Sequence, residues 1–204
     1  MARLRISSAL FLFALGIVFL QTILLNGYAL NLLGLPASAE TIFFLTTLEF
    51  IFLFIALMRA PIQIENDSLE LAGFLFVVAG TFLYFVLPAL PTFFAPSYSG
   101  DPALHLSFIY RVYSTGHIIG DDPGGPSLIA ATIAHWLAID PVRVMHPVAA
   151  LWLALTAGAV YGIAGAVLPA RAESKAIALG AAWALFIQGG IFSQLILGPN
   201  YFFS

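Results

Sequence analysis

Five apolar stretches, each long enough to cross a lipid bilayer, dominate the 204-residue chain and decide which folds are open to it. The hydrocarbon core of a bilayer is about 30 Å thick, and about 20 apolar helical residues span it. With 61% hydrophobic and only 8% charged residues, the composition is typical of a polytopic membrane protein. We therefore predict an all-α transmembrane helix bundle with about five spans. They are Ser8–Leu33, Thr41–Met58, Leu71–Phe94, Val144–Leu168 and Lys175–Leu197.

A sixth apolar piece, Ser127–Ile139, is shorter than the others. At about 1.5 Å per residue it covers only about 20 Å as a helix. A helix of this length is too short to cross the hydrocarbon core, so we expect it to be re-entrant or to lie in the membrane interface.

Basic residues fall unevenly on the two sides of these spans. Cytoplasmic loops of membrane proteins carry an excess of Lys and Arg. With a cytoplasmic N-terminus, five of the seven basic residues lie inside and two lie outside. We therefore predict a protein of the plasma (inner) membrane, with its N-terminus in the cytoplasm and with Gly34–Glu40 and the loop 95–143 on the external side. The inside set is Arg3, Arg5, Arg59, Arg171 and Lys175, and the outside set is Arg111 and Arg143.

The expected organisation has two parts. Residues 1–70 form an N-terminal transmembrane hairpin, and residues 71–204 form a core that contains the external loop 95–143. The chain ends a few residues after the fifth span. We therefore expect it to be the N-terminal part of a longer protein, or a subunit that needs a partner, with a complete small membrane protein as the alternative.

The external loop holds the polar chemistry, because all four histidines and four of the ten acids lie in or beside it. Asp101 precedes Pro102, a pair that is typical of a helix start. Capping alone can explain this aspartate. Alternatively, Asp101 and His105 lie four residues apart on one helix face and act as catalytic base and orienting group, or as two ligands of a divalent cation such as Mg²⁺ or Mn²⁺.

The helix that begins at Asp101 is expected to run to about Ser114 and to lie in the membrane interface. One face is predicted to be buried and the other to face water. The buried face would hold Leu106, Ile109, Tyr110 and Tyr113, and the polar face would hold Asp101, His105, Ser107 and Arg111.

A turn rich in glycine and proline follows this helix and contains Asp121 and Asp122. The two aspartates are either turn formers or substrate ligands that bind a cation or sugar hydroxyls; Asp122 joins Asp101 and His105 as a candidate metal ligand. Arg111 and Arg143 are the candidate phosphate-binding residues, because a guanidinium pairs with phosphate in a bidentate geometry.

Two further polar residues lie in apolar segments. Glu49 is the one acid well inside a predicted span, where ionisable groups are costly and suggest a function. We interpret it as a protonated side chain that bonds a neighbouring helix, or as the coupling carboxylate of a transporter. His135 is interpreted as a packing residue rather than a ligand, and Asp140 as the cap of the next span.

The order of these elements resembles the first external loop of the GT-C superfamily of polytopic glycosyltransferases. Gly100–His105 is similar to the loop aspartate motif of that family, and Asp122–Ala131 to its turn and second juxtamembrane helix. The resemblance covers about Leu71 to the C-terminus. It departs from the family in two extra preceding spans and in Asp-Asp-Pro-Gly-Gly at a place where an aromatic residue is common.

The resemblance implies a lipid-linked sugar donor on polyprenyl phosphate, an external acceptor, and Asp101 as the base or metal ligand that activates the acceptor. The leading hypothesis is a membrane glycosyltransferase, or the N-terminal part of one. A non-catalytic membrane subunit and a transporter component are the alternatives. Membrane lipids are expected partners and nucleic acids are not, since no basic patch exists. The absence of cysteine excludes disulfides and thiolate chemistry.

Overall fold

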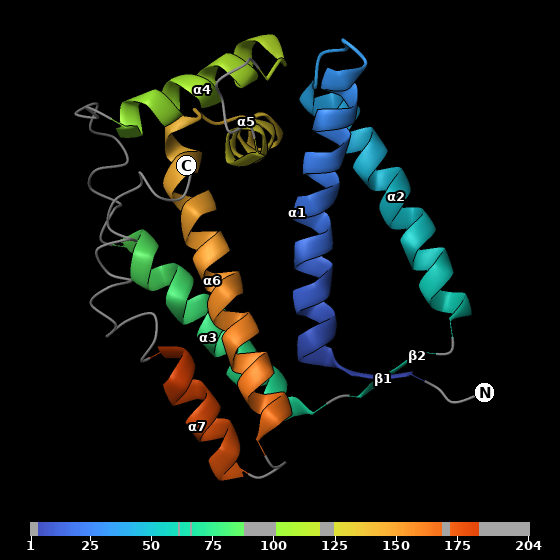
Figure 1. Cartoon of the computed structure of the whole chain (residues 1–204), viewed down its shortest axis with the longest axis vertical. Coiled ribbons are helices and arrows are strands. Elements are labelled where there is room, and N and C mark those ends of the chain that lie inside the picture. Colours follow the sequence, from blue (N-terminus) through green and yellow to red (C-terminus); the bar gives the residue numbers. More distant parts are fainter. Residues whose placement is uncertain are drawn as a thin grey trace. The chain divides into compact units, whose positions relative to one another are not determined.

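The computed structural model describes residues 4–60, 62–65, 67–87, 101–118, 125–168 and 172–183, which form helices and one two-stranded sheet (Figure 1). The predicted all-α class is confirmed apart from this small sheet. The elements are β1 (Leu4–Ser7), α1 (Ser8–Leu32), α2 (Ala39–Arg59), β2 (Ile62–Glu65), α3 (Ser68–Val86), α4 (Asp101–Thr115), α5 (Gly125–Leu137), α6 (Val142–Val167) and α7 (Ala172–Trp183).

Four of the described helices, α1, α2, α3 and α6, are long and apolar enough to span a membrane. They match four of the predicted spans, and their starts lie within three residues of the predicted starts. The predicted fifth span is described only as α7, up to Trp183, and its remainder lies outside the described residues. The short helix expected at Ser127–Ile139 is confirmed as α5, which has 13 residues.

The helix ends follow from local chemistry. α1 ends where Gly34 adopts a φ of +71°, a left-handed conformation that glycine adopts without strain. The amide of Leu35 then donates to the carbonyl of Leu30 at 2.9 Å and closes the last turn. α5 stops in the same manner at Ala138, with a φ of +52° and with the Ile139 amide bonded to the Ala134 carbonyl at 3.0 Å.

The described residues form two compact units, each assembled from separate parts of the chain. The first unit contains β1, α1 up to Ile17, β2, α3, α6 from Ala150 onward, and α7. The second contains the rest of α1, α2 up to Met58, α4, α5 and the start of α6. The predicted division near residue 70 stays a prediction.

The first unit is held together by close contacts of α3 with α6 and α7. Glycines of α3 and α6 allow rings to approach the backbone: the Tyr161 ring lies over Gly73, and the Phe74 ring lies against Gly158. On the α7 side, Phe76 stacks on Trp183 with ring centroids 5.1 Å apart.

The sheet in the first unit was not predicted. β1 and β2 pair in parallel, with Leu4 opposite Ile62 and Ser7 opposite Glu65. Each strand has only four residues. A run this short carries too few alternations to be separated from the ends of the adjoining apolar helices.

Candidate functional site

Helices α4 and α5 form the part of the second unit in which we expected the function to lie. They pack against each other. In Figure 1, α4 runs across the view and α5 is seen almost end-on, whereas the second half of α1 runs up the view. The two short helices therefore lie crosswise to the second half of α1, which is long and apolar enough to span a membrane, as interfacial helices do.

α4 begins at Asp101 and ends at Thr115, as predicted, but its buried face differs from the prediction. His105 is only 6% exposed, whereas Tyr110 is 39% exposed. The buried stripe contains His105, Phe108, Ile109 and Val112, a spacing of three and four residues that places them on one side of the helix. The prediction that His105 belongs to the polar face was therefore wrong, because His105 lies on the same side of the helix as the buried Phe108 and Val112.

The predicted site residues that the structure brings together are His105 and Arg111. Both side chains contact Phe108: the His105 ring centroid is 6.3 Å from the Phe108 ring, and the Arg111 guanidinium carbon is 5.9 Å from its centroid. Arg143 lies on the first turn of α6, where its amide bonds the Asp140 carbonyl at 2.9 Å and its side chain is exposed.

The remaining predicted ligands are described less fully. The backbone of Asp101 starts α4, and its side chain lies outside the described parts; Asp121 and Asp122 lie wholly outside the described residues. Within the described ranges, no three His, Asp or Glu side chains are close enough to hold a metal ion. The proposed cation site at Asp101, His105 and Asp122 stays a prediction.

Asp140 joins α4 to the start of α6. Its carboxylate accepts hydrogen bonds from the Val142 amide and from the Tyr110 hydroxyl, which confirms the predicted cap. Partial burial and the bond to Asp140 raise the pKa of Tyr110 to about 12, so this phenol stays protonated and continues to donate far above neutral pH.

His135 of α5 is a packing residue, as predicted. Its ring stacks on Tyr113 of α4 with centroids 3.8 Å apart, and its Nε2 lies 2.8 Å from the Tyr113 carbonyl oxygen. Because a carbonyl only accepts, the Nε2 atom must carry a proton. The contact fixes α5 against α4.

The connection between α1 and α2 touches the end of α4. The Ala37 amide donates to the Gly116 carbonyl at 2.7 Å, and the Ile118 amide donates to Asn31 Oδ1 at 3.3 Å. The Trp136 indole of α5 donates to the Ala39 carbonyl at 2.9 Å. The two segments that we predicted to share one side of the membrane are therefore in direct contact.

Glu49 has a hydrogen-bond partner on a neighbouring helix. Asn26 of α1 donates its two amide protons to Glu49 Oε2 at 3.0 Å and to Thr46 Oγ1 at 3.2 Å. Glu49 lies ten residues from each end of α2, which is about 15 Å at 1.5 Å per residue. The predicted bond to a neighbouring helix is confirmed, and it ties α1 to α2 near the middle of the span.

Replacing Asn26 by leucine is expected to lower the free energy of unfolding by about 1–2 kcal/mol, because Glu49 and Thr46 lose their common donor inside the membrane. Unfolding in detergent micelles with a rising fraction of sodium dodecyl sulfate measures the change. Thr22→Val is the control, since the Thr22 hydroxyl donates to the Phe19 carbonyl of its own helix. Equal losses in both variants would contradict a bond between the helices.

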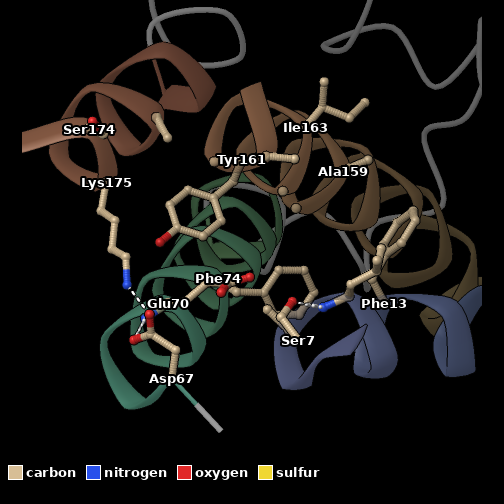
Figure 2. A pocket seen from close by; sticks show the side chains of 17 residues that line it. Ser7, Phe13, Asp67, Glu70, Phe74, Ala159, Tyr161, Ile163, Ser174 and Lys175 are labelled. Carbon is tan, nitrogen blue, oxygen red and sulfur yellow. Dashed lines mark hydrogen bonds and ion pairs between the residues drawn. The ribbon is translucent and has the colours of Figure 1, made fainter. Parts of the chain in front are cut away.

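A cavity of about 410 Å³ lies within the first unit. Its walls come from the end of β1, from the first two turns of α1, α3 and α7, and from the second half of α6. Figure 2 shows Asp67, Lys175 and the Tyr161 hydroxyl at one side of this cavity and the Phe13 ring at the other. The side of the cavity at Asp67 and Lys175, which we call its polar mouth, is therefore polar, and the opposite wall is apolar.

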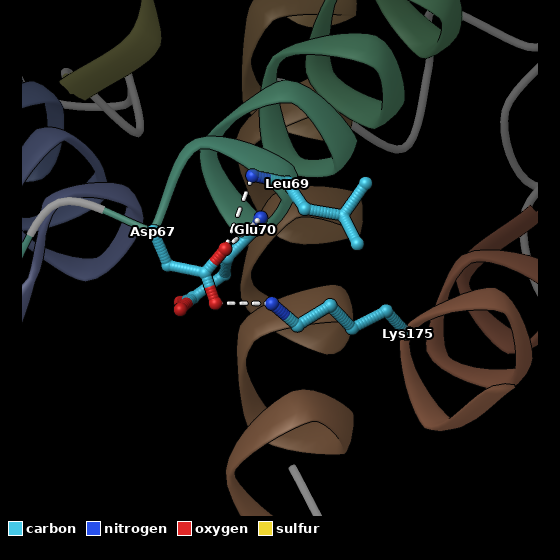
Figure 3. A network of polar contacts seen from close by, with 4 residues as sticks. All are labelled: Asp67, Leu69, Glu70 and Lys175. Atoms are coloured by element: carbon cyan, nitrogen blue, oxygen red, sulfur yellow. Dashed lines mark hydrogen bonds and ion pairs between the residues drawn. The ribbon is translucent and has the colours of Figure 1, made fainter. Parts of the chain in front are cut away.

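Asp67 bonds to both α3 and α7 at the polar mouth (Figure 3). One carboxylate oxygen caps α3 by accepting from the amides of Leu69 at 3.0 Å and Glu70 at 3.1 Å, and the other pairs with Lys175 of α7. The Lys175 ammonium and these amides hold the pKa of Asp67 below its ordinary value. The Asp67 carboxylate therefore stays charged at neutral pH, and its pairing with Lys175 links α3 to α7.

This cavity was missed in the sequence. Asn66–Glu70 was visible only as a polar break between apolar segments. The available signal was the set of glycines in the fourth span, of which Gly158, Gly162 and Gly165 line the cavity. Their spacing shows a face without side chains, but the sequence does not show which helix lies opposite it.

Comparisons with protein-family models, with curated proteins and with solved structures give no match for this chain.

Proposed function

We propose that this protein is a membrane glycosyltransferase of the GT-C type, or the N-terminal part of one. It would transfer a hexose or pentose from a polyprenyl-phosphate donor to an acceptor at the membrane surface where α4 and α5 lie. The arrangement of α4 and α5 carries the proposal. A helix that starts at Asp101 packs on a second short helix, and in the sequence both lie between two helices that are long and apolar enough to span a membrane, α3 and α6.

This arrangement suits a reaction between a lipid and a water-soluble group. Two helices in the interface place their polar residues at the depth of lipid headgroups, which is where the phosphate of a polyprenyl carrier lies. In this proposal the acceptor arrives from the water at the first turn of α4, the helix that starts at Asp101. The basic residues Arg111 and Arg143 belong to the same unit.

In the proposed reaction, separate residues activate the acceptor and stabilise the leaving phosphate. The Asp101 carboxylate takes the proton from the acceptor hydroxyl as its oxygen attacks the anomeric carbon, a role worth about 10²–10⁴ in rate. The bond from that carbon to the donor phosphate breaks, and Arg143 or Arg111 stabilises the charge on the departing phosphate. His105, which is buried against Phe108, positions the first turns of α4 instead of contacting the substrate.

The orientation is part of the proposal. The sequence places five of the seven basic residues on the side of the predicted spans that holds the N-terminus, and this excess favours a cytoplasmic N-terminus. The two short helices then lie on the external face of the plasma membrane, where a carrier would deliver its sugar.

The test is transfer of a radiolabelled sugar by the full-length protein in membranes. Polyprenyl-phosphate-linked hexoses and pentoses are supplied one at a time, with the corresponding nucleotide sugars as controls. We expect one lipid-linked donor to lose its label to an acceptor, and the nucleotide sugars to keep theirs. Failure of every lipid-linked donor would overturn the proposal and favour a non-catalytic subunit.

A further inference from the structure

The polarity of the residues that line the cavity in the first unit changes with depth. Asp67, Glu70, Ser174 and Lys175 lie at or near the starts of α3 and α7. On the opposite wall, the lining of α6 reaches from Ala166 back to Gly158. Gly158 lies nine residues before the end of α6, or about 14 Å at 1.5 Å per residue. The cavity is therefore polar at the membrane boundary and apolar toward the membrane interior.

The apolar depth is lined by Leu10, Phe13, Phe74 and Ile163, together with glycines and alanines of α6. Leu10 and Ile163 are themselves 53% and 65% exposed, so the cavity opens to the surroundings of the helices, which in a membrane are lipid chains. A volume of about 410 Å³ lies in the range of sites for small organic ligands. An alkyl chain that enters from the bilayer can fill this depth.

The charges at the polar mouth favour a cationic ligand group over an anionic one. It contains the carboxylates of Asp67 and Glu70 and the ammonium of Lys175. Asp67 and Lys175 form an ion pair, whereas no side chain among the described residues pairs with the Glu70 carboxylate. Among the described residues, Glu70 is therefore the carboxylate of this mouth with which an arriving cation can pair. An arriving anion instead has to compete with Asp67 for Lys175.

We propose that this cavity binds a membrane phospholipid that carries a primary ammonium, with its headgroup at Glu70 and one acyl chain along Phe13, Phe74 and α6. The headgroup class is that of phosphatidylethanolamine. The lipid occupies the leaflet that contains the starts of α1, α3 and α7. The lining residues belong to the first unit, whereas the proposed sugar-transfer residues belong to the second, and the lipid proposal does not depend on sugar transfer.

Native mass spectrometry of the full chain tests the proposal. The protein is purified in detergent with equal amounts of phosphatidylethanolamine and phosphatidylglycerol that have identical acyl chains. We expect the ethanolamine lipid to be retained about tenfold more than the glycerol lipid, as one charge-assisted hydrogen bond would give. Glu70→Gln is expected to remove this preference, and Glu70→Lys to reverse it.

Two further variants separate binding from folding. Gly162 lines the cavity, and no atom lies within 4 Å of a Cβ added there, so we expect Gly162→Leu to occupy the cavity and to remove both lipids from a folded protein. Glu173→Gln removes an exposed acid from the first turn of α7, outside the cavity lining, and should change nothing. Equal retention of the two lipids by the unmodified protein, or an unchanged preference in Glu70→Lys, would overturn the proposal.

Discussion

Asp101→Asn is expected to reduce sugar transfer by about 100-fold or more while the folded protein remains in the membrane. Asparagine cannot accept the proton of the acceptor hydroxyl, so the rate loses the contribution of a general base. It nevertheless caps a helix start about as well as aspartate does. The start of α4 is therefore preserved, and a loss of transfer reports on chemistry rather than on folding. Initial rates of label transfer from the lipid-linked donor measure the effect.

The chain provides a matched control in Asp140. It also precedes a proline at a helix start, and its carboxylate caps α6 at the Val142 amide. Asp140→Asn makes the same chemical change at another Asp-Pro pair of the loop, and we expect its rate to fall less than about threefold, since the capping oxygen remains. Similar rates for both variants, whether both low or both normal, would remove Asp101 from the mechanism.

Much of the fold could be predicted because each membrane span is one continuous segment of the sequence. The length of an apolar run sets whether it can cross the bilayer, which placed α1, α2 and α6 within a few residues. The short length of α5 identified it as a non-spanning helix for the same reason. Asp101 was found at the start of α4 because its cap-and-proline pattern is also local.

The relations between segments could not be predicted in this way. In lipid, helices that are apolar on all sides associate through small residues and a few polar bonds, so no hydrophobic stripe marks the interface. The sequence showed Glu49 without showing that Asn26 faces it. The buried face of α4 was misjudged because His105, a polar residue, belongs to the same stripe as Phe108.

The glycines of α6 determine how closely α3 can pack beside the cavity. At Gly158, an added Cβ would lie 2.8 Å from Phe74 Cε2 and 2.9 Å from Val78 Cγ2, both on α3. These distances are shorter than carbon contacts allow, and a ring and a β-branched side chain have little freedom to move away. Gly158→Leu is therefore expected to force α6 from α3 and to lower the free energy of unfolding by about 3 kcal/mol.

Gly162 lies one turn further along α6 and gives the matched control, because no atom lies within 4 Å of its added Cβ. Gly162→Leu should change the free energy of unfolding by less than about 1 kcal/mol, since the cost of filling open space is small and leucine favours a helix more than glycine does. Unfolding of both variants in the same detergent, after removal of bound lipid, makes the comparison. Equal stabilities would show that α3 does not pack on the Gly158 face of α6. A large loss for Gly158→Leu alone would establish that this glycine sets the distance between the helices and, with it, the width of the cavity beside Phe74.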